Sequence, residues 1–375
     1  MVASSVVNKG ARNRYDELDG LRALSVLGIV AFHMFPATGL WFTVNLFFVL
    51  SGFFITTNLR ASDRSSLWRY VAVFYRKRIV RIVPLYLCYL GVLAGLYGTI
   101  MSLGVLPRYS TSLLTFTYNL TRAAPDWIFN EYFTHFWSLS VEMQFYLIWP
   151  WVMVFCPARW LPAVCVGIIG ATPLWRYELS EWFLAHGVPL NAIADCVYWS
   201  TLGHFDAFAA GALVAMFLGA SESSRRRWQQ AGFLLLVLAG VGNIFYLGAV
   251  PGYDAKLLVS LGYPIHNTHA LQHIWAGSVL TIAWATLVWR LVGDREGVWW
   301  FTRLLRRASF VDIGRVSYGM YIWHWLVLIT LFEYVPTQST LLRVVIVFPA
   351  ASAVTYLLAK CSNRLIEAPA QRYFR

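Results

Sequence analysis

The feature that most constrains this chain is a series of apolar runs, each about as long as a membrane-spanning helix. A helix needs about 20 predominantly apolar residues to cross roughly 30 Å of hydrocarbon. Such runs recur over the whole sequence, and the polar stretches between them are too short for a soluble domain. We predict ten crossings, over residues 19–38, 40–58, 79–103, 137–156, 161–175, 197–219, 230–250, 270–292, 315–333 and 342–360.

The composition agrees with this interpretation. Of the 375 residues, 58% are hydrophobic and only 13% are charged, and the mean hydropathy is +0.56. A soluble protein of this size needs more polar surface. The sequence therefore predicts an all-α, polytopic integral membrane protein, with residues 1–375 in one membrane-embedded domain. Arg22 interrupts the first apolar run, so an uncleaved first span is expected rather than a signal peptide.

The positive charges are distributed unevenly between the two sides of the predicted bundle. With ten crossings both termini fall on one side, together with most of the 30 Lys and Arg residues. The other side receives only Arg108, Arg122, Arg176, Lys256 and Arg343. The positive-inside rule therefore predicts cytoplasmic N- and C-termini, with Lys9, Arg12 and Arg14 in the N-terminal segment. The net charge of +12 does not indicate a nucleic-acid-binding protein, because no nucleic-acid-binding motif accompanies it.

The apolar stretch 110–120 is too short for a span, and a crossing there would invert every later loop. We predict a re-entrant or interfacial segment.

Two polar residues stand out in the first apolar run, DGLRALSVLGIVAFHMF (19–35). Arg22 and His33 are eleven residues apart, about three helical turns, so they share one face roughly 16 Å apart along the axis. Ionisable groups at membrane depth are costly and usually face a cavity or a partner. The pair is a candidate functional site. In the alternative interpretation, Arg22 reaches lipid phosphate or pairs with Asp19, and His33 merely bonds a neighbouring helix.

A second polar strip lies in FWSLSVEMQFYLIWP (136–150), where Ser138 and Glu142 share a face and Gln144 lies on the adjacent row. Counted from the predicted span ends, Glu142 and His33 lie at about the same depth, roughly 8–9 Å from the outer boundary. We predict that the carboxylate orients the imidazole, which then acts as a general base. A buried ion pair that only joins two helices is the alternative.

The segment RYVAVFYRKRIVRIVPLY (69–86) is expected to be a loop that enters a helix before Pro84. Its basic residues Arg76, Arg78 and Arg81 could clamp the phosphates of a nucleotide-bearing donor, because guanidinium groups match phosphate oxygens. A topology signal in contact with lipid headgroups would use the same residues.

Other polar groups carry weaker signals. His266, His269 and His273 have a spacing that could ligate zinc, but no nearby acidic residue completes a known metal motif, so no metal is predicted. His204 and Asp206 could line a cavity or bond neighbouring helices. A proton-coupled transporter remains possible, since intramembrane His, Glu and Arg also form proton relays, although no inverted repeat is recognisable.

Seven motifs in order along the chain resemble the acyltransferase 3 family of bacterial multi-pass membrane O-acyltransferases. The motifs are DGLRALSVLGIVAFH, NLFFVLSGFFI, RKRIVRIVPLY, FWSLSVEMQFYLIWP, FDAFAAGALVA, GRVSYGMYIWHW and NRLIEAP. The resemblance implies transfer of an acyl group, often acetyl, from cytoplasmic acyl-CoA to a hydroxyl of a carbohydrate or a glycosylated metabolite. It also implies a bacterial cytoplasmic membrane location.

Carried onto matching positions, the resemblance makes His33 and Arg22 the catalytic signature and Glu142 their acidic partner. Residues expected to line the cavity are Asn45, Ser51, Trp137, Ser138, Gln144 and His324. The chain departs from the family pattern at Asn45, where an Asp is common, and at Met143, where many members have a second Glu. Some relatives carry an additional hydrolase-like domain, for which no room is expected here. A macrolide or another secreted natural product is the alternative acceptor.

Overall fold

The computed structural model describes residues 15–36, 38–97, 104–124, 126–250, 254–335 and 339–373. Every regular element in these ranges is helical. The helices are α1 (Asp16–Met34), α2 (Thr43–Arg60), α3 (Leu67–Leu96), α4 (Leu106–Leu114), α5 (Phe136–Phe155), α6 (Leu161–Ala185), α7 (Leu190–Tyr198), α8 (Phe205–Met216), α9 (Glu222–Gly248), α10 (Asp254–Val259), α11 (Gln272–Gly293), α12 (Trp300–Leu305), α13 (Ala308–Arg315), α14 (Ser317–Tyr334), α15 (Thr340–Leu342), α16 (Phe348–Ser362) and α17 (Ala368–Tyr373). Short 3₁₀ segments join some of them, and two π-helical turns, Arg343–Val347 and Asn363–Glu367, flank α16.

The all-helical, multi-pass membrane architecture is confirmed. Five segments of the described chain are long and apolar enough to cross a membrane: Gly39–Arg60, Leu67–Leu96, Glu222–Gly248, His269–Gly293 and Thr340–Tyr373. Each of the other predicted spans overlaps a helix, but the total of ten crossings and the side of each terminus stay predictions. The predicted N-terminal basic residues, Lys9, Arg12 and Arg14, lie outside the described residues.

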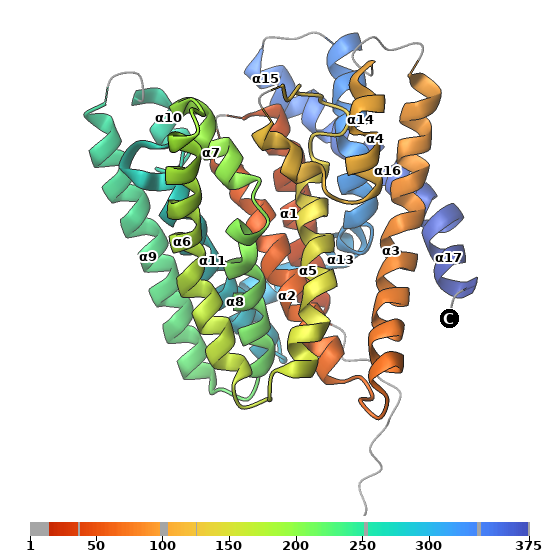
Figure 1. The fold of residues 1–375 in the computed structure, drawn as a ribbon, viewed down its shortest axis with the longest axis vertical. Helices are drawn as coiled ribbons and strands as arrows, with labels where there is room; N and C mark the ends of the chain where they lie inside the picture. Colours follow the sequence, from red (N-terminus) through yellow and green to blue (C-terminus); the bar gives the residue numbers. More distant parts are fainter. Residues whose placement is uncertain are drawn as a thin grey trace, which may run out of the picture.

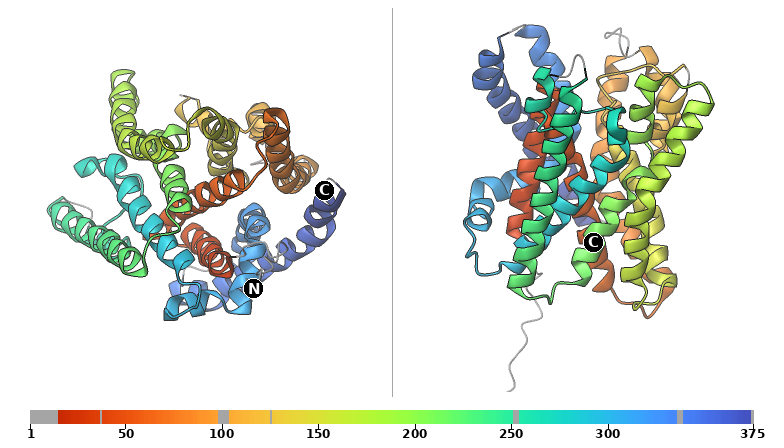
Figure 2. Two further views of the ribbon diagram at one scale, coloured as in Figure 1. Left: turned by 90° about the horizontal axis from the view of Figure 1, so that it is seen from below. Right: turned by 90° about the vertical axis from the view of Figure 1, so that its left-hand side faces the viewer.

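The long helices run side by side and surround α1 and α2, which lie near the centre when the bundle is viewed along its length (Figures 1 and 2). The connections α2–α3, α5–α6 and α8–α9 gather at the lower end of Figure 1. Arg60, Arg159 and Arg225–Arg227 lie in or beside these connections. The basic segments therefore meet at one end, as the positive-inside argument expects.

The helix α3 begins earlier than predicted. Its start is at Leu67 rather than residue 79, because Ser66 caps it: the Ser66 hydroxyl accepts from the backbone N–H of Arg69 at 3.5 Å. The basic stretch 69–86 is therefore helical throughout, and the prediction of a loop there is wrong. Pro84 lies within the helix.

The segment 110–120 contains the end of α4, a turn and the start of the 3₁₀ turn Tyr118–Ala123. The nine residues of α4 extend about 13 Å, so no single helix of spanning length covers this segment.

Close helix contacts fix the centre of the bundle. Gly211 of α8 lies against the backbone of α2, where an added Cβ would be 2.8 Å from Phe53 N and 2.9 Å from Val49 C. Gly314 of α13 meets the backbone of Asp19 in the same way. Small residues let helices in a membrane approach closely and gain van der Waals contact.

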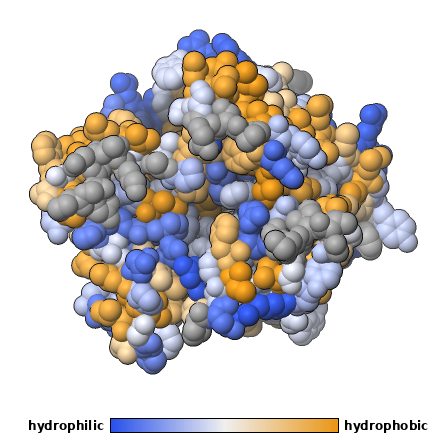
Figure 3. All heavy atoms as spheres, turned by 90° about the horizontal axis from the view of Figure 1, so that it is seen from above, coloured by the Kyte–Doolittle hydropathy of each residue, from blue (hydrophilic) through white to orange (hydrophobic). Residues whose placement is uncertain are grey.

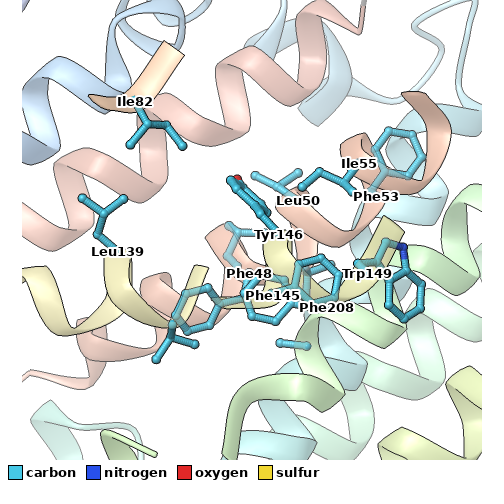
Figure 4. Close-up of a cluster of buried hydrophobic side chains, with 14 of the residues drawn as sticks. Phe48, Leu50, Phe53, Ile55, Ile82, Leu139, Phe145, Tyr146, Trp149 and Phe208 are labelled. Atoms are coloured by element: carbon cyan, nitrogen blue, oxygen red, sulfur yellow. The ribbon is translucent and has the colours of Figure 1, made fainter. Parts of the chain in front are cut away.

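An aromatic cluster fills the space between α2, α5 and α8 (Figure 4). The rings of Phe145 and Phe208 stack with centroids 4.1 Å apart, and Phe48 packs 4.8 Å from Phe208. All three side chains are almost fully buried. This packing holds the α5 motif residues in a fixed register against α2.

Arg176, expected in an external loop, lies buried within α6. It forms an ion pair with Asp206 at 2.8 Å and donates to the carbonyl of Gly203 and to Ser278. Asp206 also accepts from Ser278 at 2.7 Å. The predicted span 161–175 is too short, because α6 continues to Ala185 and this pairing satisfies the buried charge.

Candidate active site

A cavity of about 210 Å³ lies where α1 ends and α5 begins, which is the upper end of the bundle in Figure 1. We call it the upper cavity. The end of α1, the start of α5 and residues of α7 and α14 form its walls. Its main lining residues are Phe32, His33, Trp41, Arg122, Trp127, His135, Trp137, Ser138, Asp195, Tyr198, Trp199, His266, Tyr321 and Trp325. On the end face of the molecule, hydrophilic side chains border a central hollow (Figure 3).

Three histidines from separate helices or helix ends meet at this cavity. His33 Nδ1 lies 3.0 Å from His324 Nε2, and the two rings stack with centroids 5.0 Å apart. His135, directly before α5, places its ring 5.0 Å from that of His324. His33 and His135 line the cavity, whereas His324 is fully buried behind His33.

Charged and aromatic groups lie together on another wall of the upper cavity. Asp195 forms ion pairs with Arg122 at 2.8 Å and with His266 at 2.6 Å. Burial alone would raise the pKa of Asp195, but the hydrogen bonds and charges of these two partners hold that pKa below its ordinary value. The guanidinium of Arg122 also lies 4.4 Å from the Trp127 ring centroid, within reach of a cation–π interaction.

A second, smaller pocket of about 80 Å³ lies deeper in the bundle, and we call it the arginine pocket. Arg22 of α1 and Arg78 and Arg81 of α3 line it together with one carboxylate, Glu142 of α5. The last two arginines are three residues apart on one helix, so they share a face. Three guanidinium groups therefore face a single carboxylate.

Two of the arginines have spare hydrogen-bonding capacity. The Nε atoms of Arg22 and Arg78 are buried and lack a hydrogen-bond partner among the described residues. The guanidinium of Arg22 lies over the Phe54 ring at 5.0 Å, and that of Arg78 lies between the rings of Phe74 and Tyr146. Buried donors without partners are costly, so this pocket is suited to an anionic ligand.

Glu142 is held by hydroxyl groups. Ser51 and Tyr146 both donate to its Oε1 atom. These two bonds tie the carboxylate to α2 and to the next turn of α5.

The two cavities are adjacent. Ile29, Val44, Ser138 and Tyr321 line both of them. The Tyr321 hydroxyl donates to the His135 carbonyl, so the Ser138 hydroxyl, 2.9 Å away, is the donor in the bond between the two hydroxyls. A thin wall of side chains thus separates an aromatic, histidine-lined cavity from a cationic pocket.

The predicted pairing of Glu142 with His33 is wrong in geometry. No hydrogen bond joins them in the described chain; His33 contacts His324, and Glu142 contacts Ser51 and Tyr146. The depth estimate fails because α1 ends at Met34 rather than residue 38, which places His33 level with His135. Glu142 lies seven residues further along, about 10 Å deeper.

The other predicted site residues lie in different parts of the bundle. Ser51, Arg78 and Arg81 line the arginine pocket, Trp137 lines the upper cavity, and Ser138 lines both. Asn45 lies instead in a separate small pocket beside Arg176, where its side-chain amide donates to the Gly277 carbonyl at 3.2 Å.

Like Asn45, three further predicted residues line neither the upper cavity nor the arginine pocket. Arg76 is exposed on the opposite face of α3 from Arg78. Gln144 bridges loops, since its amide donates to the Phe116 carbonyl and to Asn119. His324 supports His33 from behind.

Sequence reasoning missed His135 and Tyr321. His135 directly precedes a recognised motif and Tyr321 lies inside one, and each is a polar group at the end of, or inside, an apolar helix. Neither ring nitrogen of the buried His135 has a hydrogen-bond partner in the described residues. An intramembrane ionisable group is a functional candidate by default, and this rule would have identified His135.

The histidines of the HNTHALQH segment do not converge on one site. His266 pairs with Asp195, while His273 bonds Ser180 at 3.0 Å. In the described ranges, no cluster of three or more His, Cys, Asp or Glu side chains is arranged to hold a metal ion.

Comparisons with known proteins agree with the motifs. Over 364 residues the chain is 23% identical to the O-acetyltransferase OatA of Staphylococcus aureus and 24% identical to SACOL0978, provisionally named an O-acetyltransferase, of the same species. The alignments cover 95% and 94% of this chain but only 57% and 56% of those proteins, so the chain spans about half the length of these relatives. No solved structure matches it. The family model described as an acyltransferase domain matches residues 15–360, so the chain belongs to the acyltransferase 3 family.

Proposed function

We propose that this chain is an O-acyltransferase of the bacterial cytoplasmic membrane, moving an acetyl group from acetyl-CoA to a hydroxyl of a carbohydrate acceptor. In this proposal residues 1–375 act as one catalytic domain. The observation that carries it is the pair of adjacent cavities, one cationic and one lined by histidines and aromatic rings. Family membership and the O-acetyltransferase names of the relatives support the reaction class.

The arginine pocket is the proposed donor side. Arg22, Arg78 and Arg81 exceed the single carboxylate of Glu142 in charge, which favours the phosphate groups of acyl-CoA. A pocket of about 80 Å³ is too small for a whole coenzyme A but accommodates the narrow acyl-bearing end of its pantetheine arm. In this proposal the phosphates of the donor lie at the mouth of the pocket beside Arg78 and Arg81, and the nucleotide extends toward the basic connections at the lower end of Figure 1.

The upper cavity is the proposed acceptor side. Trp127, Trp137 and Trp199 supply flat apolar surfaces, and the Arg122–Asp195 pair supplies hydrogen-bonding groups. Binding sites for small organic ligands combine a mainly apolar lining with a few well-placed polar groups. A sugar ring presents both an apolar C–H face and hydroxyls, so this lining suits a carbohydrate.

The proposed chemical step takes place at the wall between the cavities. His33 accepts the proton of the acceptor hydroxyl while that oxygen attacks the thioester carbonyl carbon. The tetrahedral intermediate then expels the coenzyme A thiolate, which receives the proton from His33. The products are an O-acyl ester and free thiol, and the enzyme returns to its starting state without a covalent intermediate.

Arg22 and Glu142 have supporting roles in this proposal. Arg22 binds negative charge on the donor side, since it lines the arginine pocket and not the upper cavity. Glu142 holds Ser51 and Tyr146 in place and balances part of the arginine charge. Glu142 bonds Ser51 and Tyr146 rather than His33, so another residue must orient the His33 ring.

The experiment uses purified protein in lipid vesicles with radiolabelled acetyl-CoA and a panel of oligosaccharides and macrolides. We expect acetyl transfer to an oligosaccharide hydroxyl, reduced at least 100-fold in His33→Ala because a general base typically contributes that much or more. His186→Ala, a histidine change at an exposed position at the end of α6, is the matched control and should retain full activity.

Unchanged turnover in His33→Ala would remove His33 from the mechanism. Acetylation of macrolides alone would refute the carbohydrate acceptor. Transport of a solute without any acetyl-CoA-dependent product would refute the enzyme and favour the transporter.

A further inference from the structure

His324 lies in an unusual position for a polar residue of a membrane helix. Its ring is fully buried within α14, and it lines neither the upper cavity nor the arginine pocket. Both of its nitrogens are engaged: Nδ1 lies 2.6 Å from the carbonyl oxygen of Tyr321, and Nε2 lies 3.0 Å from His33 Nδ1. His324 therefore lies outside both cavities, and the side chain to which it is hydrogen-bonded in the described residues is that of His33.

The chemistry of these two bonds fixes the positions of the protons. A carbonyl oxygen can only accept, so His324 Nδ1 carries a proton and donates it to Tyr321. In a neutral ring the other nitrogen is then an acceptor, so His33 Nδ1 must donate to His324 Nε2. The remaining nitrogen, His33 Nε2, is left with a free lone pair.

The surroundings favour neutral rings. Among the described residues, no carboxylate contacts His33 or His324; the nearest ring partners are His135, Trp325 and Phe32. The charged groups of the upper cavity, Arg122 and Asp195, pair with each other on another wall, where His266 also contacts Asp195. A charge without a partner is costly in such a site, so the neutral pair is the favoured state before substrate binds.

We infer that His324 is a positioning residue that holds His33 in the Nδ1-protonated tautomer and thereby leaves Nε2 as the proton acceptor. This inference rests on the proposed function of His33 as general base. His33 is only partly buried and lines the upper cavity, and its Nε2 atom has no hydrogen-bond partner in the described residues. The free nitrogen is thus the one available to a substrate hydroxyl.

The same arrangement helps during turnover. When Nε2 takes the proton from the acceptor hydroxyl, His33 becomes an imidazolium whose Nδ1–H still points at His324 Nε2. The hydrogen bond is then charge-assisted, and such bonds are roughly twice as strong as neutral ones. His324 therefore performs with an imidazole the task that a carboxylate performs in many general-base histidines.

Two substitutions separate this role from simple packing. His324→Phe keeps a ring of similar size but removes the acceptor, whereas His324→Gln keeps an amide oxygen near the Nε2 position. We expect kcat to fall about 100-fold in His324→Phe, at the upper end of losses seen when an outer-shell partner is removed. KM for acetyl-CoA should stay unchanged, and His324→Gln should recover at least tenfold of the lost kcat.

A direct readout is the tautomer itself. In protein with ¹⁵N-labelled histidine, studied in vesicles by solid-state NMR, the His33 signals are assigned from their loss in His33→Ala. Wild type should show a protonated Nδ1 and an unprotonated Nε2 for His33, and His324→Phe should show a mixture of both tautomers. The pH profile of kcat should also shift between these two proteins.

The outcomes distinguish this inference from the proposed function. Full activity in His324→Phe, or a wild-type His33 with its proton on Nε2, overturns the inference even if His33 is essential. Full activity in His33→Ala with the expected tautomer overturns the role of His33 as base, while the structural assignment stands. If His324→Phe fails to fold, the wild-type spectrum and His324→Gln still decide the matter.

Discussion

Gly211→Ala in α8 tests how tightly the centre of the bundle is packed. The added methyl carbon would lie 2.8 Å from Phe53 N and 2.9 Å from Val49 C on α2, whereas ordinary contacts of this kind are 3.4–4 Å. The nearest atom, the Val49 carbonyl oxygen, would overlap the added carbon, so the two backbones must move apart. Overpacking of this kind costs about 1–3 kcal/mol, occasionally more. The usual gain from replacing a helical glycine, about 0.5–1 kcal/mol, does not offset it.

The matched control is Gly91→Ala in α3, where an added Cβ meets no atom within 4 Å. Thermal unfolding followed by the fluorescence of the 18 tryptophans should show a midpoint several degrees lower for Gly211→Ala and equal or higher for Gly91→Ala. Ser51 lies between the two contacted α2 residues and donates to Glu142, so kcat should fall as well.

Equal midpoints in the two variants would show that α2 and α8 can separate without cost. The close approach would then not position Ser51, and the link between packing and the arginine pocket would be refuted.

Three further predictions concern charged groups. Arg81→Ala should raise KM for acetyl-CoA about tenfold or more, which corresponds to the loss of one charged hydrogen bond. Arg76→Ala, at an exposed position on the same helix, should leave KM unchanged. Equal effects of the two substitutions would refute the arginine pocket as the donor site. The pKa of Asp195 is lowered in the folded protein, so its pairing stabilises the fold above the ordinary aspartate pKa of about 3.9. This stability is lost as the pH falls toward the folded pKa. Asp195→Asn should therefore flatten the acid side of a plot of unfolding free energy against pH. Asp206→Asn leaves a buried guanidinium without its anion and should lower the free energy of unfolding by about 3 kcal/mol, measured by denaturant titration in detergent.

The helices themselves could be predicted from the sequence because long apolar runs have few alternatives in a membrane. Helix ends were less predictable. The start of α3 depends on the cap at Ser66, and the end of α1 at Met34 leaves the following residues outside the helix. The first turns of α3 carry basic residues such as Arg69 and Arg76, and α1 ends within an apolar stretch, so hydropathy alone misplaced both boundaries.

The residues of the candidate site were mostly identified, but their partners were not. Arg22 and Arg81 come together in one pocket from helices whose polar faces were recognised. The contact between His33 and His324 joins residues 291 positions apart, and no periodicity in a single sequence reports such a contact. Depth counting suggested that Glu142 meets His33 because it assumed that the first helix continues to residue 38, whereas α1 ends at Met34.

The hydroxyl pair of Ser138 and Tyr321 carries a consequence for the cell that contains this protein. A water-filled channel open to both sides of the membrane would let protons and ions leak and would dissipate the membrane potential. Here the two bonded hydroxyls, 2.9 Å apart, form part of the wall between the two cavities, together with Ile29 and Val44. The proposed reaction requires this wall to admit an acetyl group, whereas an intact membrane potential requires it to stay closed to ions, so its side chains must meet two opposing demands.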